Sequence, residues 1–212
     1  MRLEKEPIIQ NALGVCSAEE DTRLLARVSA QVGRPGGRAL DLGAGTGYVA
    51  CYLALQGMQV DATDVSTRAL ELTRRNVERN GIAVRIFYSN LFSHVEGEYD
   101  VIAFNPPMNP QETEVSRWIT SFLRRHQGVA NLLMGVFDRF FTHSRLDFLV
   151  NFLQQARRHL APGGHIVMEM TRLEIDELAG RLPDFAFGPR FDIPRLPSEQ
   201  IVVISPKGEP AS

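Results

Sequence analysis

Three alternating glycines follow a short apolar segment in the first quarter of the chain. The apolar segment, residues 38–42, predicts a buried parallel strand. Gly43, Gly45 and Gly47 then permit a tight turn and the close approach of a ligand to the backbone. A helical pattern over residues 48–56 comes next. Strand, glycine turn and helix together predict the first half of a nucleotide-binding unit.

An acidic residue, Asp64, stands at the end of the next predicted strand, which covers residues 58–63. An acid roughly 20 residues past such glycines is placed to accept hydrogen bonds from ribose hydroxyls. Two alternatives remain open. Asp64 could instead cap the following helix while the glycines form only a structural turn. The loop could also hold an NAD-type dinucleotide, but the third glycine comes one residue earlier than the Gly-x-Gly-x-x-Gly spacing requires.

A second motif, Asn105-Pro106-Pro107, follows a predicted apolar strand over residues 99–104. Proline has no N–H and holds the residue before it in an extended conformation, so this turn offers acceptors rather than donors. The side-chain oxygen of Asn105 and the carbonyl of Pro106 can both accept from one NH2 group. Such fixed acceptors hold the nitrogen while its delocalised lone pair turns toward an electrophilic methyl group. The alternative is a rigid turn without a catalytic role.

Together, and in this order, the two motifs predict methyl transfer from S-adenosylmethionine to nitrogen, with Asn105 and Pro106 as the catalytic residues. Strand and helix patterns alternate along the chain, which predicts an α/β protein with a doubly wound parallel sheet. The loops at the C-terminal ends of its strands should line one crevice. The further predicted elements are strands over 83–88 and 165–170, helices over 145–160 and 173–181, and a closing hairpin of 185–191 with 200–205.

The composition suits one α/β domain over residues 1–212, which we expect to begin with a helical segment over residues 1–37. No apolar run is long enough to span a membrane, no signal-peptide pattern is present, and two cysteines are too few for a disulfide framework. We therefore expect a cytoplasmic protein with no membrane partner. The five histidines lack metal-ligand spacing, so no metal is expected. The net charge of −2 disfavours a broad nucleic-acid-binding face, and the oligomeric state stays open.

Several segments resemble class I S-adenosylmethionine-dependent methyltransferases. They are most similar to the HemK-like family, whose members methylate a glutamine of translation release factors. The segments that carry this resemblance are Ala18–Thr22, Asp41–Gly47, Asp64–Ser66, Asn90–Phe92, Tyr99–Pro107 and Leu160–Glu169. The resemblance implies a mostly parallel, seven-stranded, Rossmann-like sheet with a C-terminal antiparallel hairpin, and S-adenosylmethionine as the cofactor.

The resemblance also implies roles for individual residues. The glycines would wrap the methionine part of the cofactor, Asp64 would bind the ribose, and the adenine would lie against Asn90 and Leu91. The cofactor-binding residues implied in this way are Asp41, Gly43, Ala44, Gly45, Gly47, Asp64, Val65, Asn90, Leu91 and Thr22. Pro107 and Met108 would face the acceptor. The family has tyrosine or phenylalanine at the position of Met108, where a planar target group packs.

Residues 109–144 separate the Asn-Pro-Pro motif from the next predicted helix and mix basic with aromatic side chains. Helical spacing within this segment favours a lid that closes over the crevice, with Trp118 and His126 against the substrate. A surface that stacks on and neutralises nucleic acid is the alternative.

We therefore expect an N-methyltransferase that acts on an amide, aryl-amine or ring nitrogen of a small molecule or a protein glutamine. A nucleic-acid base is an alternative acceptor and ranks lower. Two alternatives belong to other functional classes: a non-catalytic cofactor-binding partner and an NAD-type oxidoreductase. Retention of Asn105-Pro106-Pro107 disfavours the first, and the glycine spacing disfavours the second.

Overall fold

The structure is a computed structural model that describes residues 5–12, 19–106 and 145–208. The chain divides into two compact units, Met1–Pro106 together with Gln154–Ser212, and Pro107–Leu153. The first unit contains the sheet and the glycine loop. Within the described residues, no helix is long and apolar enough to cross a membrane.

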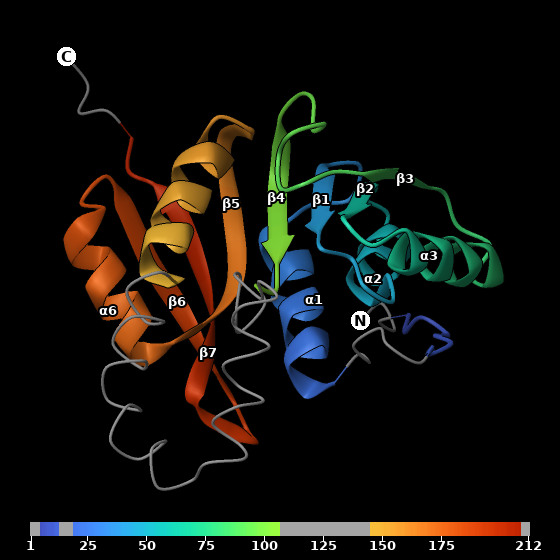
Figure 1. Cartoon of the computed structure of the whole chain (residues 1–212), viewed down its shortest axis with the longest axis horizontal. Coiled ribbons are helices and arrows are strands. Elements are labelled where there is room, and N and C mark those ends of the chain that lie inside the picture. Colours follow the sequence, from blue (N-terminus) through green and yellow to red (C-terminus); the bar gives the residue numbers. More distant parts are fainter. Residues whose placement is uncertain (1–4, 13–18, 107–144, 209–212) are drawn as a thin grey trace, which may run out of the picture. The chain divides into compact units, whose positions relative to one another are not determined.

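One seven-stranded sheet forms the centre of this unit, with the strand order β3-β2-β1-β4-β5-β7-β6 (Figure 1). Strands β1 to β5 are parallel, and β7 runs antiparallel to both of its neighbours. The strands are β1 Arg38–Leu42, β2 Gln59–Asp64, β3 Val84–Tyr88, β4 Tyr99–Phe104, β5 Leu160–Thr171, β6 Phe185–Ile193 and β7 Leu196–Pro206. This arrangement confirms the predicted fold class, including the C-terminal hairpin.

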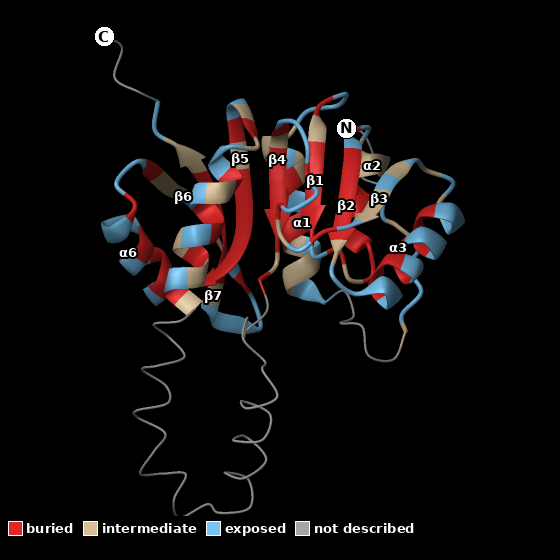
Figure 2. Ribbon diagram, turned by 45° about the horizontal axis from the view of Figure 1, so that its top comes forward, coloured by how far each residue is buried: buried red, intermediate tan, exposed pale blue. Residues whose placement is uncertain are grey.

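The helices are α1 Glu20–Val32, α2 Tyr48–Leu55, α3 Thr67–Arg79 and α6 Arg172–Arg181, and residues 145–157 are also helical. Helix α1 packs against α2 and α2 against α3, so these three form one layer. Helix α6 covers strands β5 to β7, at the end of the sheet opposite α3 (Figure 1, Figure 2). Exposed residues lie mainly on the outer faces of the helices (Figure 2). Strands β1, β2 and β4 are largely buried, whereas the edge strands β3 and β6 are mostly half-buried or exposed.

The start of β5 differs from the prediction. The predicted helix over residues 145–160 ends at residue 157, and Leu160 already pairs with Tyr99 of β4. The Tyr99 N–H donates to the carbonyl of His159 at 2.8 Å, which draws the chain into the sheet before the Pro-Gly-Gly sequence. Residues 161–164 then bulge out of the pairing, because Pro162 lacks an N–H and Gly163 is left-handed with φ 76°.

The N-terminal segment also contains less helix than the prediction of a helical segment over residues 1–37. Helix α1 covers only part of that range, and the described residues 5–12 are not helical. Their backbone pairs with side chains of α3 and its cap instead: the N–H of Ile8 donates to Asn80 and that of Gln10 to Asn76, each at 2.8 Å. Backbone groups satisfied in this way have no need of an intrahelical partner.

The strand order places the two sequence motifs side by side. The connections from β1 and β4 lead to opposite ends of the sheet, and the two strands are neighbours. In open α/β sheets, such a switch point leaves a crevice at the carboxyl ends of the strands. The glycine loop follows β1 and Asn105 follows β4, so both border this crevice. Residues Val101 to Phe104 of β4 are almost completely buried and anchor Asn105 rigidly.

Candidate active site

The glycine loop is held by backbone hydrogen bonds to the neighbouring strand. The N–H groups of Gly43 and Ala44 both donate to the carbonyl of Thr63, at 2.8 and 2.9 Å. Gly47 has φ 76°, and a side chain there would lie 2.6 Å from the Cγ2 atom of Thr73 on α3. Glycine at this position therefore permits both the left-handed turn and the close packing of the loop on α3.

Asp41 supports the glycine loop from within the protein. Its side chain is buried, and one carboxylate oxygen accepts from the Ala50 N–H at 2.9 Å, which ties β1 to α2. Burial raises the pKa of Asp41 to about 7, with a further rise from the charge of Asp64, while the bond from Ala50 opposes the shift. These contacts fix the strand and helix on either side of the loop.

Asp64 joins the loop to the start of α3. Its Oδ2 accepts from the Gly45 N–H at 3.0 Å, and its Oδ1 accepts from the Ser66 N–H at 2.8 Å. Ser66, rather than Asp64, is the N-cap of α3, since its hydroxyl accepts from the Ala69 N–H. Each carboxylate oxygen of Asp64 keeps acceptor capacity beyond these bonds, so two adjacent ribose hydroxyls fit this position.

An apolar surface lies beside Asp64 at the ends of β2 and β3. Tyr88 is the register partner of Asp64, and the side chains of Tyr88 and Val65 are 50% and 56% exposed. Exposure of large apolar groups at a strand end provides a flat contact for a heterocyclic base. Sequence reasoning proposed Val65 but missed Tyr88, although its place at the end of a predicted strand beside Asp64 was the available signal.

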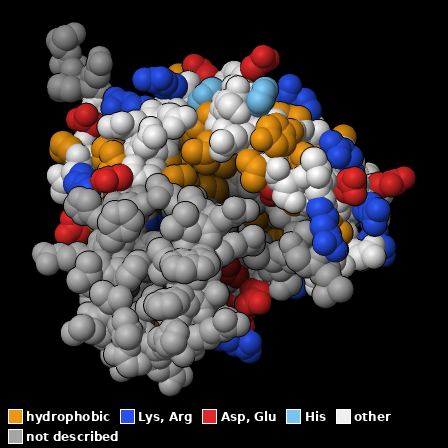
Figure 3. Space-filling view, viewed as in Figure 1, with side chains coloured by type: hydrophobic (Ala, Val, Ile, Leu, Met, Phe, Trp, Pro, Cys, Tyr) orange, Lys and Arg blue, Asp and Glu red, His pale blue; other side chains and the backbone are white. Residues whose placement is uncertain are grey.

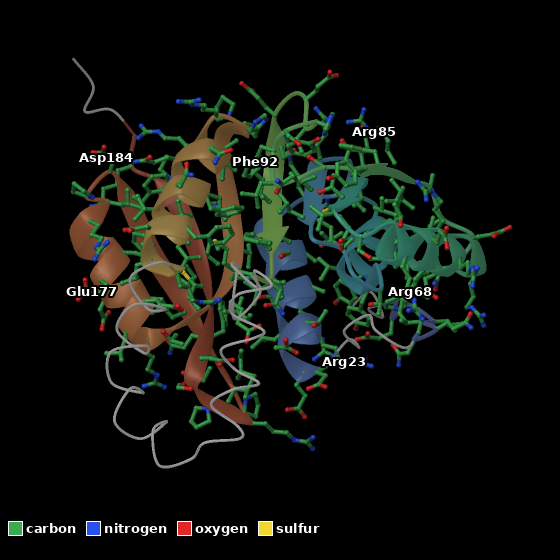
Figure 4. All side chains as sticks on the ribbon, in the orientation of Figure 1. Arg23, Arg68, Arg85, Phe92, Glu177 and Asp184 are labelled. Carbon is green, nitrogen blue, oxygen red and sulfur yellow. The ribbon has the colours of Figure 1, made fainter. Side chains whose placement is uncertain are left out.

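The loop that carries Asn90 and Leu91 has a strained, well-anchored turn. Leu91 adopts φ 50°, which is uncommon for a residue other than glycine. The Ser89 hydroxyl donates to the Leu91 carbonyl at 2.6 Å. Phe92, labelled in Figure 4, stacks on His159 with ring centroids 5.0 Å apart. Strain of this kind persists where surrounding contacts impose it, and it is frequent at ligand sites.

The NH2 group of the Asn105 side chain is held by an acid from another part of the chain. Its Nδ2 donates to Oδ2 of Asp21 at 2.9 Å, a contact between residues 84 positions apart. Asp21 lies in the first turn of α1, and the hydroxyl of Thr22 is 3.5 Å from its other oxygen. A carboxylate oxygen without a proton can only accept, so the Asn105 Oδ1 points away from Asp21 and keeps its capacity to accept a hydrogen bond. Pro106, whose carbonyl is the second predicted acceptor, directly follows Asn105 and is buried.

Two further acids lie next to Asp21. Glu169 of β5 is 9% exposed, and burial, hydrogen bonding to Glu199 and Asp21, and the charges of these two residues raise the pKa of Glu169 to about 9. Glu169 therefore carries a proton at neutral pH and is a hydrogen-bond donor. Sequence reasoning named neither Asp21, Glu169 nor Glu199 as site residues. Asp21 lay within a segment that supported the family resemblance, but the two glutamates had no local signal.

The structure brings the predicted cofactor residues together along the carboxyl ends of β1 to β3, and Asn105 with Thr22 next to β4. The residues predicted to contact the acceptor, Pro107, Met108, Trp118 and His126, lie outside the described residues. The predicted lid over 109–144 also lies outside them and stays a prediction.

Comparison with known proteins gives the family. The family model "Methyltransferase small domain" matches residues 8–131, which is more than half of the chain. A ribosomal RNA small subunit methyltransferase C of Chromohalobacter salexigens is 36% identical over 113 residues, which are 52% of this chain and 33% of that protein. A release factor glutamine methyltransferase of Deinococcus radiodurans is 31% identical over 147 residues, 68% of this chain and 49% of that protein. The chain thus spans half or less of these relatives.

Solved structures share the fold at low sequence identity. A methyltransferase from Pyrococcus furiosus has a TM-score of 0.66 and 22% identity, covering 96% of this chain and 90% of that one. The tRNA (uracil-54, C5)-methyltransferase of Pyrococcus abyssi, solved with S-adenosyl-L-homocysteine, has a TM-score of 0.59 and 17% identity, covering 95% and 44%. The predicted fold and cofactor class are thereby confirmed. The chain belongs to the methyltransferase small domain family, and its described core is an S-adenosylmethionine-dependent methyltransferase domain.

Proposed function

We propose that this protein transfers a methyl group from S-adenosylmethionine to an amino nitrogen of an RNA base. The observation that carries the nitrogen assignment is the Asn105 amide, whose Nδ2 is engaged by Asp21 so that Oδ1 remains as an acceptor at the end of β4. An exocyclic amino group has a delocalised lone pair and needs such an acceptor to be held in an attacking orientation.

Three groups of described residues would each hold one part of the cofactor. The loop from Gly43 to Gly47 would hold the methionine part, and the Asp64 carboxylate would accept from the ribose hydroxyls. Val65, Tyr88 and Leu91 would cover the adenine. Bound S-adenosylmethionine supplies an electrophilic methyl group on a sulfonium: the S–CH3 bond breaks as the N–CH3 bond forms, and the nitrogen then releases a proton to water.

The chain's own contribution to the reaction is positioning. Oδ1 of Asn105 and the Pro106 carbonyl accept from the two N–H bonds of the target amino group, which directs its lone pair toward the methyl group. Neither acceptor needs to move, because β4 behind them is buried on both faces. Preorganised groups of this kind contribute to rate without reorganisation at the moment of reaction.

The relatives support RNA as the acceptor. The ribosomal RNA small subunit methyltransferases C match at up to 43% identity, although over a shorter stretch of 75 residues. The surface also offers phosphate contacts: α3 exposes four arginines against two glutamates, and Arg68 stands at its start (Figure 3, Figure 4). The exposed arginines are Arg68, Arg74, Arg75 and Arg79. Basic residues on one face are the electrostatic footprint of a phosphate backbone. An RNA base therefore ranks above the small-molecule and protein acceptors that the sequence favoured.

A protein glutamine is the second candidate, since the release factor glutamine methyltransferase matches 68% of this chain at 31% identity. Its amide NH2 has the same delocalised lone pair and would use the same two acceptors.

The acceptor can be identified by following labelled methyl groups. The protein is incubated with S-[methyl-3H]adenosylmethionine in three parallel reactions. Each reaction contains one acceptor: unmodified ribosomal RNA, small ribosomal subunits or release factor. We expect label in RNA, recovered as an N-methylated nucleoside after digestion, and loss of label with Asn105→Ala. Label only in release factor would replace RNA by glutamine. Label on carbon or ribose oxygen would overturn the N-methyl mechanism.

A further inference from the structure

We infer that Asp21 is a positioning residue that sets the orientation of the Asn105 amide. This inference rests on the proposed function, because it concerns the acceptor oxygen used in N-methyl transfer. Its basis is the hydrogen bond from Asn105 Nδ2 to Asp21 Oδ2, 2.9 Å long and formed between the end of β4 and the first turn of α1.

The chemical reason lies in the two-sided nature of an amide. An asparagine side chain can turn over and exchange its NH2 group for its oxygen with little change in shape. In one orientation Asn105 presents an acceptor to the target amino group, and in the other it presents a second donor, which repels it. A carboxylate at the Nδ2 position accepts in the first orientation and has no donor to offer in the second. Asp21 therefore selects the productive orientation.

Asp21 is itself held in place by its neighbours. The Thr22 hydroxyl is 3.5 Å from Asp21 Oδ1. Glu169 of β5 and Glu199 of β7 lie beside Asp21, and the raised pKa of Glu169 lets its single O–H donate to one of these two neighbours. No three acidic, imidazole or thiol groups among the described residues are arranged to hold a metal ion. The neutral glutamic acid lets a carboxylate remain at position 21 without an additional buried charge beside it.

A purely structural role for Asp21 makes a different prediction. An acid in the first turn favourably meets the positive end of the helix dipole, and Glu20 occupies the same turn of α1. If Asp21 acts only through the dipole, replacing either acid should have a similar small effect. If it orients Asn105, only position 21 should affect turnover. Glu20→Gln is thus the matched control.

The test compares Asp21→Ala, Asp21→Asn, Asn105→Asp and the double variant Asp21→Asn/Asn105→Asp. We expect Asp21→Ala to lower kcat roughly 10- to 100-fold, the size of one hydrogen bond to a charged group, with unchanged affinity for S-adenosylhomocysteine. Asp21→Asn should lose less, because its amide oxygen can still accept. Asn105→Asp places two carboxylates face to face and should be nearly inactive.

The double variant restores the hydrogen bond with donor and acceptor exchanged, since Asn at position 21 can donate to Asp at position 105. It should recover at least about fivefold over Asn105→Asp alone. This rescue would not follow from a structural role and remains measurable if Asp21→Ala fails to fold. A double variant no more active than Asn105→Asp, or an Asp21→Ala kcat equal to that of Glu20→Gln, would overturn the role of Asp21. An active Asn105→Ala enzyme would instead overturn the proposed function.

Discussion

Replacing Asp64 by alanine tests the cofactor site most directly. The substitution removes the carboxylate that accepts hydrogen bonds from the N–H of Gly45 in the glycine loop and from the N–H of Ser66 at the start of α3. The Ser66 bond is exposed, so water can take the place of the carboxylate there. The Gly45 bond is partly buried, and the ribose hydroxyls would lose a charged acceptor as well. The main loss is therefore in the loop and at the ligand.

One hydrogen bond to a charged group contributes about 1.5–3 kcal/mol, so the dissociation constant of S-adenosylhomocysteine should rise roughly 10- to 150-fold in Asp64→Ala. Asp64→Asn keeps one acceptor oxygen but turns an NH2 group toward a donor, and its dissociation constant should lie between those of wild type and Asp64→Ala. Isothermal titration calorimetry with S-adenosylhomocysteine measures both.

The control is Glu71→Gln, which removes a negative charge from the exposed face of α3 without touching the loop. Its affinity should equal that of wild type. A cooperative thermal melt without ligand establishes that each variant is folded. A rise in melting temperature on adding S-adenosylhomocysteine then reports binding, because the ligand stabilises only the folded state. Unchanged affinity in folded Asp64→Ala would refute the assignment of Asp64 to the ribose and remove the main support for the cofactor orientation argued above.

Three other substitutions probe the catalytic acceptor, the buried acid and the glycine loop. Asn105→Ala should lower turnover roughly 10²- to 10³-fold while S-adenosylhomocysteine affinity is retained, and single-turnover kinetics would show a normal rate if the motif is only a turn. The pKa of Glu169 rises from 4.5 to about 9 on folding, so its stabilising contribution is full below pH 4.5 and is lost as the pH rises toward 9. Glu169→Gln should flatten this fall in denaturant titrations across that range, and an unchanged slope would contradict it. Gly47→Ala should destabilise the fold by about 1–3 kcal/mol, because its methyl group would meet Thr73 in a backbone conformation that favours glycine. A melting temperature equal to wild type would show that α3 can move away.

Local sequence patterns were sufficient to predict most strands of the sheet, the glycine loop and the position of Asn105. The apolar runs of β1, β2 and β4 predicted their strands to within a residue or so, since buried parallel strands need continuous apolar sequence. The glycines predicted a tight turn, and all three have positive φ angles in the structure. Asn105 could be proposed from its neighbours, since Pro106 limits the turn to acceptors.

The boundary of β5 could not be predicted locally. Helical periodicity continued to Leu160, yet pairing with Tyr99 placed that residue in the sheet, and pairing partners far apart in sequence outweigh intrinsic preference. The absence of a helix over residues 5–12 has the same origin, because side chains of α3 and its C-cap satisfy their backbone.

By itself, the sequence determined the cofactor class and proposed Asn105 as the source of the acceptor oxygen, because glycine, aspartate and Asn-Pro-Pro have chemistry that depends on their immediate neighbours. Only the tertiary structure revealed the side chain that contacts the Asn105 amide. Asp21 reaches Asn105 across 84 residues, and Glu169 and Glu199 join them from β5 and β7. Hydrogen bonds between distant segments leave no periodic signal in the sequence, since each requires only that one polar atom arrive within about 3 Å of another.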